Sequence, residues 1–143
     1  RLFLLGAGPG VAEAAGAALR SHYPTLTIAG ALAGSPRPCD EAAIGAAIRS
    51  ARPDILLVAF GAPAQDLWIA RNRSALGVPV AIGVGGAFDF LAGRIPRAPG
   101  WMRRLGVEWF YRLARQPWRW RRMIALPRFA AMVLVLNVTR GRE

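Results

Sequence analysis

Residues 55–63, Ile-Leu-Leu-Val-Ala-Phe-Gly-Ala-Pro, form an apolar run that is closed by a turn. A strand that is apolar on both faces is typical of the centre of a parallel sheet, because helices cover such a sheet from both sides. Gly61 and Pro63 both favour turns, and residues 64–76 then have a composition that suits a helix. The stretch therefore predicts one β-α unit of an α/β protein.

The same alternation of strand-like and helix-like segments extends on both sides of this unit. We expect further strands at residues 2–5, 26–29 and 78–84, helices at residues 11–21 and 40–50, and a loop at residues 30–38. Repeated β-α units of this length predict a Rossmann-like parallel sheet with right-handed connections. The expected fold class is α/β, with a body at residues 1–93 and a basic helical appendage at residues 94–143.

Charge is distributed unevenly along the chain. The protein has 143 residues, 54% of them hydrophobic, and a net charge of +11, and all 19 basic residues are Arg. Residues 1–93 hold 7 Arg and 6 acidic residues, a balance of +1, whereas residues 94–143 hold 12 Arg and 2 acidic residues, a balance of +10. The apolar fraction excludes a disordered chain. The basic segment favours a polyanionic partner such as a pyrophosphate, an anionic membrane surface or a nucleic acid.

The composition disfavours metal and disulfide chemistry. The chain has one Cys and one His, which can form neither an internal disulfide nor a zinc site of Cys and His ligands. A Ser/His/Asp or Cys/His catalytic set cannot be assembled from the sequence either. We therefore expect no metal and no cofactor. Residue 1 is Arg, directly before a strand-like run, which indicates a piece of a longer protein.

The basic segment has the pattern of an amphipathic helix. Trp101, Leu105, Trp109 and Leu113 recur at every fourth residue of a helix predicted at residues 101–115. Residues 129–138 are apolar, but a membrane-spanning helix needs roughly 20 such residues. Arg and Trp together suit a helix in a lipid headgroup layer, so residues 101–135 are expected to bind an anionic membrane surface peripherally. The alternative is that these Arg side chains are solvated.

Two predicted strand ends carry the candidate binding residues. In an open parallel sheet, ligands bind beyond the carboxyl ends of the strands, where Gln65 and the glycine-rich stretch 83–90 are expected to lie. The Gln65 side chain offers a donor and an acceptor to a sugar hydroxyl. Gly85 and Gly86 allow backbone N–H groups to approach a ligand, and Asp89 accepts hydrogen bonds from a ribose or an imide. The alternatives are a solvated first helical turn for Gln65 and a helix cap for Asp89.

A third predicted strand end, Gly-Ala-Gly-Pro-Gly at residues 6–10, matches a dinucleotide-binding turn only in part. The third glycine of that fingerprint would fall at Val11, and residues 27–35 contain no acidic residue that could bind a ribose. The turn therefore predicts either a tight β-α connection or a contact of its amides with a phosphate at the start of a helix.

Four blocks of sequence, taken in order, resemble the WecG/TagA/CpsF family of bacterial glycosyltransferases. They are residues 53–58 (Pro-Asp-Ile-Leu-Leu-Val), 61–69 (Gly-Ala-Pro-Ala-Gln-Asp-Leu-Trp-Ile), 84–93 (Val-Gly-Gly-Ala-Phe-Asp-Phe-Leu-Ala-Gly) and 97–109 (Arg-Ala-Pro-Gly-Trp-Met-Arg-Arg-Leu-Gly-Val-Glu-Trp). The Gly-Gly-Ala-Phe-Asp and Met-Arg-Arg-Leu-Gly blocks, in that order, are the most specific part of the resemblance.

The resemblance implies inverting transfer of a sugar, of the N-acetylmannosamine type or its uronate, from a UDP donor to a polyprenyl-pyrophosphate-linked acceptor. It implies a metal-independent enzyme of cell-envelope or exopolysaccharide synthesis, cytoplasmic and peripherally bound to the inner face of the cell membrane. By this resemblance Gln65 lines the sugar and pyrophosphate pocket, and the nucleotide is contacted by Gly85, Gly86, Phe88 and Asp89. The acceptor pyrophosphate would be contacted by Arg112, Arg119 and Arg122.

The chain also departs from the family pattern. The family usually has Lys and Glu on either side of the Gln, where this chain has Ala64 and Asp66, and an aromatic residue near Ser35. Family members carry a longer N-terminal part, which holds the Asp expected to act as general base. The catalytic base is therefore expected upstream of Arg1.

Two other functions stay open at this stage. One is a catalytically inactive nucleotide-binding or membrane-docking subunit. The other is a nucleic-acid-binding module, in which Arg and Trp together contact a single strand. The Trp residues of the basic segment fall on the apolar stripe of a predicted helix, so we expect no nucleic acid partner. A homo-oligomer is compatible with the sequence.

Overall fold

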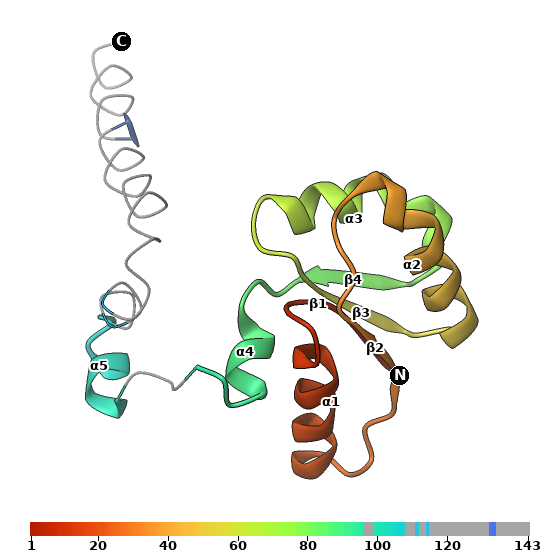
Figure 1. Ribbon diagram of the computed structural model, residues 1–143. Helices are drawn as coiled ribbons and strands as arrows, with labels where there is room; N and C mark the ends of the chain where they lie inside the picture. The colour runs from red at the N-terminus through yellow and green to blue at the C-terminus, as the bar shows by residue number, and fades with distance from the viewer. Residues whose placement is uncertain (96–98, 108–110, 112–113, 115–131, 134–143) are drawn as a thin grey trace. The chain divides into compact units, whose positions relative to one another are not determined.

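The computed structural model describes residues 1–95, 99–107, 111, 114, 132 and 133. The chain divides into two units, Arg1–Pro96 and Arg97–Glu143, and each is described by itself. In the first unit four strands alternate with helices (Figure 1), which confirms the predicted α/β class. The division falls three residues after the boundary expected from the charge distribution.

Each strand and helix predicted within residues 1–93 is present in the structure. The strands are β1 (Leu2–Gly6), β2 (Ile28–Leu32), β3 (Ile55–Ala59) and β4 (Val80–Gly83). The helices are α1 (Val11–His22), α2 (Pro38–Ala51), α3 (Ala64–Leu76) and the short α4 (Ala87–Leu91).

The predicted bounds of the second strand were wrong, because β2 continues through residues 30–32, where a loop was expected. Glycine is uncommon in strands, and Gly30 therefore suggested a loop. Here the missing side chain is required, since a Cβ atom at Gly30 would lie 2.5 Å from Cε2 of Phe3. The ring of Phe3 occupies the space that a larger residue in β2 would fill.

The four strands form one parallel sheet in the order β2-β1-β3-β4. From β1 the chain moves outward to β2, then returns past β1 to β3 and continues to β4. Its direction along the sheet therefore reverses once, after β2. The strand β3 lies in the interior of the sheet, as its unbroken apolar run predicted.

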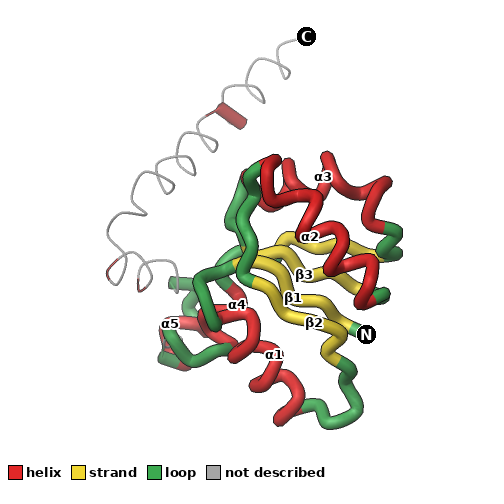
Figure 2. Tube along the Cα trace, turned by 45° about the vertical axis from the view of Figure 1, so that its right-hand side comes forward, coloured by secondary structure: helices red, strands yellow, loops and turns green. Residues whose placement is uncertain are grey.

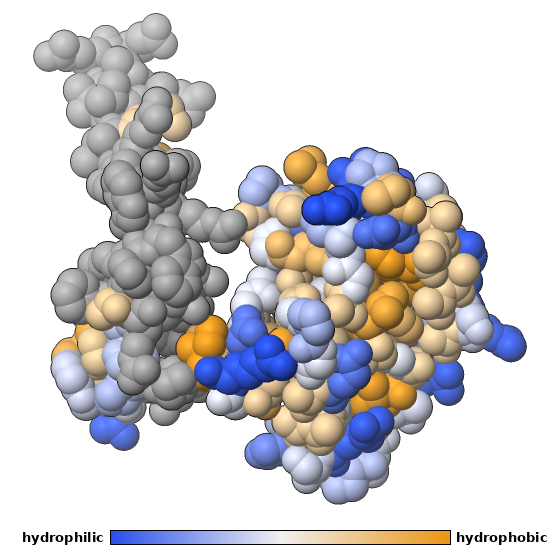
Figure 3. All heavy atoms as spheres, viewed as in Figure 1, coloured by the Kyte–Doolittle hydropathy of each residue, from blue (hydrophilic) through white to orange (hydrophobic). Residues whose placement is uncertain are grey.

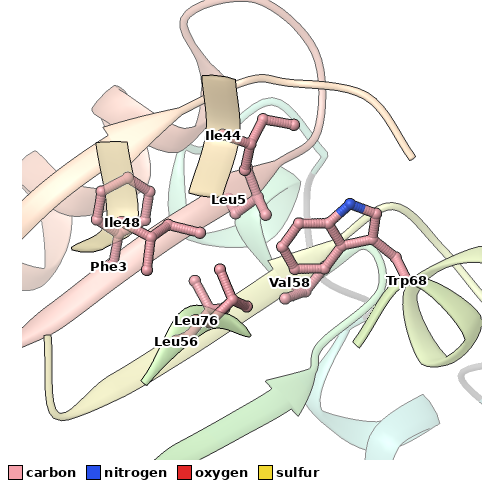
Figure 4. Packing of buried hydrophobic residues seen from close by; sticks show 8 residues of the cluster. All are labelled: Phe3, Leu5, Ile44, Ile48, Leu56, Val58, Trp68 and Leu76. Carbon is pink, nitrogen blue, oxygen red and sulfur yellow. The ribbon is translucent and has the colours of Figure 1, made fainter. Parts of the chain in front are cut away.

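Helices cover both faces of the sheet (Figures 1 and 2). The helices α2 and α3 cover one face, over a buried cluster (Figure 4) of Phe3, Leu5, Ile44, Ile48, Leu56, Val58, Trp68 and Leu76. The helices α1 and α4 lie on the other face, over a second cluster of Leu4, Val11, Ala12, Ala15, Ala59 and Phe88. Successive residues of β1 and β3 enter opposite clusters, as the two-residue period of a strand requires.

An ion pair links the two helices of the first face. Arg71 of α3 donates from Nη2 to Oε1 of Glu41 in α2 over 2.7 Å, and also to the backbone oxygen of Pro36 over 3.1 Å. This hydrogen bond from Arg71 lowers the pKa of the Glu41 carboxyl. The pair fixes the start of α2 to the middle of α3.

The second unit contains the short helix α5 (Gly100–Arg104). The single helix predicted at residues 101–115 is wrong at its centre, because residues 105–107 are not helical. Gly106 adopts φ 70°, and the N–H of Val107 donates to the oxygen of Met102 over 3.0 Å, as at a helix end closed by a left-handed glycine. Most of residues 108–143 lie outside the described residues. In the part of the chain that the structure describes, no helix is long and apolar enough to cross a membrane.

Candidate functional site

The loops that follow the strands gather at one end of the sheet, the carboxyl end of its strands, because all four strands run in the same direction. In Figure 2 the label N marks the start of β1 and so the amino ends of the strands. The loops after β1, β3 and β4 lie at the opposite ends of the strands. These loops hold residues 7–10, residues 60–63 and residues 84–86. This carboxyl end of the sheet holds all four candidate residues, Gln65, Gly85, Gly86 and Asp89.

The side chain of Gln65 is turned into the protein. Gln65 lies in the first turn of α3 and is only 7% exposed, which excludes the alternative of a solvated turn. Its backbone N–H donates to the oxygen of Gly61 over 2.9 Å. Its side-chain Oε1 accepts a hydrogen bond of 2.9 Å from the N–H of Gly85. One amide group therefore joins the start of α3 to the loop after β4.

The position of the Gln65 amide depends on the glycine at the end of β4. A Cβ atom at Gly83 would lie 2.5 Å from Nε2 of Gln65 and 3.0 Å from Oδ1 of Asp66. Any side chain at this position would therefore displace Gln65. Sequence reasoning did not single out Gly83, although a glycine within a strand often marks a close approach of another group.

The glycine loop after β4 leads directly into α4. Gly85 has φ 55°, in the left-handed region that favours glycine, and Gly86 is the N-cap residue of α4. Asp89 is therefore inside the helix and does not cap it, contrary to the structural alternative. Asp89 is a half-buried residue in the first turn of α4, where negative charge is favourable, and no described residue hydrogen-bonds its carboxylate. A contact of the Asp89 carboxylate with a ligand therefore stays a prediction.

Phe88 differs from its neighbours because its side chain points into the core. It is fully buried and packs in one cluster with Leu4, Val11 and Ala12. Any contact of this residue with a nucleotide is therefore restricted to its backbone. The ring instead holds α4 against α1, which places Gly85 and Asp89 at the edge of the sheet.

The turn after β1 is tight, and an arginine lies beside it. A Cβ atom at Gly6 would lie 2.8 Å from the backbone carbonyl carbon of Ala59, so the ends of β1 and β3 are in close contact. Arg94 donates from Nη2 to the oxygen of Pro9 over 3.1 Å. Its guanidinium would be 3.7 Å from a Cβ atom at Gly10, the N-cap residue of α1. Sequence reasoning missed Arg94, because no spacing in the sequence connects it with residues 6–10.

The remaining predicted residues are not brought into this site by the described structure. Arg112, Arg119 and Arg122 lie outside the described residues. Among the residues that are described, no three His, Cys, Asp or Glu side chains lie close enough to hold a metal ion. Asp66 and Asp89 are the carboxylates in the first turns of α3 and α4, at the same edge.

The described body is a doubly wound α/β protein, and its candidate site lies at the carboxyl ends of the parallel strands. Nucleotide ligands usually bind at this position in such folds. The chain belongs to the glycosyl transferase WecG/TagA/CpsF family, whose model matches residues 1–143. The resemblance found in the four sequence blocks is thereby confirmed.

Two curated relatives are similar to most of the chain. A Bacillus subtilis (strain 168) protein, named N-acetylglucosaminyldiphosphoundecaprenol N-acetyl-beta-D-mannosaminyltransferase, is 42% identical over 134 residues, which are 94% of this chain and 52% of that protein. A protein of the same name from Bacillus spizizenii (strain ATCC 23059 / NRRL B-14472 / W23) is 35% identical over 134 residues, 94% of this chain and 51% of its own. The chain thus spans about half the length of the curated relatives that it matches.

Proposed function

We propose that the protein is part of an inverting glycosyltransferase that moves a sugar of the N-acetylmannosamine type from a UDP donor to a polyprenyl-pyrophosphate-linked acceptor. Family membership and the names of the two Bacillus relatives support this proposal. The cell-envelope or exopolysaccharide pathway that uses the product is the corresponding biological setting. Metal-independent transfer without a cofactor remains part of the proposal.

The donor nucleotide is assigned to the loop after β4. Backbone N–H groups at Gly85 and Gly86 and the carboxylate of Asp89 are the proposed contacts. The Gln65 amide lies beside them because it is bonded to Gly85. Its Oε1 already accepts that bond, and Nε2, the donor group of the amide, is the proposed contact with a sugar or pyrophosphate oxygen.

The proposed reaction is a displacement at the anomeric carbon. The acceptor hydroxyl oxygen forms a bond to this carbon while the bond to the UDP phosphate oxygen breaks. The hydroxyl proton passes to a general base, and UDP leaves as an anion. Donors aimed at the pyrophosphate lower the barrier, because negative charge develops there as the bond breaks. The base is proposed to come from outside residues 1–143, in the part of the relatives that this chain does not match.

The basic segment is proposed to bring the site to its lipid-linked acceptor. Arg side chains form bidentate contacts with phosphate oxygens, and Arg112, Arg119 and Arg122 are the proposed contacts with the acceptor pyrophosphate. Residues 101–135 would bind the anionic inner face of the cell membrane. Co-sedimentation with vesicles tests this step: binding should require anionic lipid and decrease with salt. Binding that persists when residues 101–143 are deleted would contradict it.

The observation that carries the donor site is the buried Gln65 amide bonded to the glycine loop that precedes Asp89. Isothermal titration of the protein with UDP tests it. We expect Asp89→Ala to weaken binding by at least about tenfold, since a hydrogen bond to a charged group contributes about 1.5–3 kcal/mol. Asp54→Ala is the matched control, because Asp54 directly precedes β3 and so lies at the amino ends of the strands, away from the candidate site. Equal affinities of Asp89→Ala and the unaltered protein would remove Asp89 from the site.

A turnover assay separates binding from catalysis. With UDP-N-acetylmannosamine and a lipid-linked acceptor, residues 1–143 alone should bind UDP without transferring the sugar. Transfer should be restored when residues 1–143 are joined to the unmatched part of the Bacillus subtilis relative. Transfer by residues 1–143 alone would show that the base lies within this chain.

A further inference from the structure

A carboxylate lies beside the Gln65 amide at the start of α3. The position that a Cβ atom at Gly83 would take is 2.5 Å from Nε2 of Gln65 and 3.0 Å from Oδ1 of Asp66. The two side chains therefore approach the end of β4 at the same point, one with a donor nitrogen and the other with an acceptor oxygen. We call Gln65, Asp66 and Gly83 the α3–β4 corner.

The two polar side chains of the α3–β4 corner differ in exposure. Gln65 is buried and its Oε1 is bonded to Gly85, whereas Asp66 is exposed. Hydrophilic side chains are exposed over much of α2 and α3 (Figure 3), so exposure alone does not distinguish Asp66. Its distinguishing feature is its position beside a buried amide at the carboxyl end of β4. A ligand that reaches the amide of Gln65 therefore also meets the carboxylate of Asp66.

The charge of the α3–β4 corner disfavours a phosphate group. The first turn of a helix attracts an anion, because its backbone N–H groups carry partial positive charge. In α3 the carboxylate of Asp66 already places an anion in that turn. A pyrophosphate oxygen at Nε2 of Gln65 would bring a second negative charge close to the carboxylate, and the two charges would repel each other.

A sugar hydroxyl group fits the α3–β4 corner better. A hydroxyl group both donates and accepts hydrogen bonds, so it can accept one from Nε2 of Gln65 and donate one to Asp66. A hydrogen bond with an ionised partner is roughly twice as strong as one between neutral groups. The carboxylate that repels a phosphate therefore favours a sugar hydroxyl at the same point.

We propose that Asp66 is a specificity-determining residue that accepts a hydrogen bond from a hydroxyl group of the transferred sugar. The Gln65 amide then contacts the sugar, and the diphosphate of the donor lies outside the α3–β4 corner. This proposal rests on the proposed function, because it requires a UDP-sugar bound at the loop after β4. It adds which part of the donor the corner recognises.

Titration of the protein with two ligands tests the proposal. UDP and UDP-N-acetylmannosamine share the nucleotide and the diphosphate, and they differ by the sugar. We expect Asp66→Ala to weaken the binding of UDP-N-acetylmannosamine by at least about tenfold, as for the loss of a hydrogen bond to a charged group, and to leave the affinity for UDP within about twofold. Asp66→Glu keeps a carboxylate and should lose less affinity for UDP-N-acetylmannosamine than Asp66→Ala.

Glu13→Ala is the matched control. Glu13 is the acidic residue in the first turn of α1, and α1 lies on the other face of the sheet from α3. Both substitutions remove a negative charge from the start of a helix, so they should have similar effects on stability. Glu13→Ala should leave the ratio of the two affinities unchanged, whereas Asp66→Ala should change it.

The two affinities also separate this proposal from the proposed function. If the unaltered protein binds both ligands and Asp66→Ala leaves the ratio of their affinities unchanged, the sugar contact is overturned and the donor site stands. Tighter binding of both ligands to Asp66→Ala would overturn the proposal as well, because the diphosphate would then lie against the carboxylate. If the unaltered protein binds neither ligand, the donor site fails and this proposal fails with it.

UDP-sugars that each lack one hydroxyl group supply a second measurement. Removal of the hydroxyl group that donates to Asp66 should weaken binding to the unaltered protein and should have no further effect in Asp66→Ala, because the effects of two interacting groups are not additive. If every deoxy analogue loses the same factor of affinity in both proteins, no hydroxyl group contacts Asp66 and the proposal is overturned.

Discussion

The side-chain Oε1 of Gln65 and the backbone N of Gly85 lie 2.9 Å apart in a hydrogen bond that joins the first turn of α3 to the loop after β4, 20 residues further along the sequence. The glutamine is buried, so this bond is sheltered from competing water. A buried amide with both of its functions near the strand ends can hold a loop and also donate to a ligand. The two functions can be separated by substitution.

Gln65→Leu should destabilise the protein by about 1–3 kcal/mol, because the N–H of Gly85 then loses its partner in a sheltered position. Gln65→Glu keeps an acceptor for Gly85 but removes the Nε2 donor. We therefore expect Gln65→Glu to lose less stability than Gln65→Leu, while both variants lose sugar transfer in the joined enzyme. Urea unfolding and the turnover assay measure the two effects. Equal stability of Gln65→Leu and the unaltered protein would show that the hydrogen bond does not contribute.

Gly83→Ala should displace the amide of Gln65, because the added Cβ atom would lie 2.5 Å from Nε2 and 2.8 Å from Cδ. We expect a loss of stability of about 1–3 kcal/mol, in the range of overpacked sites, and a shifted amide resonance of Gly85 in NMR spectra. Gly16→Ala is the control, since Gly16 lies inside α1 and its added Cβ atom would make an ordinary contact of 3.5 Å with Ile28 of β2. That control should gain roughly 0.5–1 kcal/mol, as Ala replaces Gly in a helix. An unchanged Gly85 resonance in Gly83→Ala would contradict the positioning role.

The sequence predicted the order of strands and helices in the body because each β-α unit has its own local signals. The apolar run at residues 55–60 and the turn at Gly61 are of this kind. Burial of Gln65 was not predictable, since it depends on the distant Gly83 and Gly85. The inward direction of Phe88 likewise depends on the packing of α4 against α1. Local patterns thus predicted that the candidate residues follow the carboxyl ends of the strands, whereas contacts between distant residues determine which way their side chains point.

Arg71→Gln should raise the pKa of the Glu41 carboxyl toward its ordinary value. The hydrogen bond from Arg71 is the main cause that holds this pKa low. A carboxyl whose pKa is lower in the folded state contributes stability above its unfolded pKa and loses that contribution as the pH falls through the folded value. The Arg71→Gln variant should therefore show a weaker loss of stability on acidification below about pH 4.5. NMR titration of Glu41 measures the pKa, and Arg73→Gln, on the same helix, is the control that should leave it unchanged.

Trp68 is fully buried in the cluster between the sheet and the helices α2 and α3 (Figure 4). Its ring contacts the ring of Phe60 edge-on, with the two ring centroids 5.8 Å apart. No described residue hydrogen-bonds its Nε1 atom. Trp68→Ala should cost about 3–5 kcal/mol of stability, because a large cavity replaces the ring. Trp68→Phe keeps most of the packing and removes an unpartnered N–H, whose burial costs about 1–3 kcal/mol, so it should cost clearly less.

Urea unfolding of both variants decides between packing and hydrogen bonding as the main contribution of Trp68. Trp101→Ala is the matched control, because Trp101 is 60% exposed and its removal should change stability by no more than about 0.5 kcal/mol. If Trp68→Phe costs as much as Trp68→Ala, then Nε1 makes a hydrogen bond in solution. In that case the indole N–H, which lies one helical turn after Gln65, would stabilise the start of α3 through that bond as well as through packing.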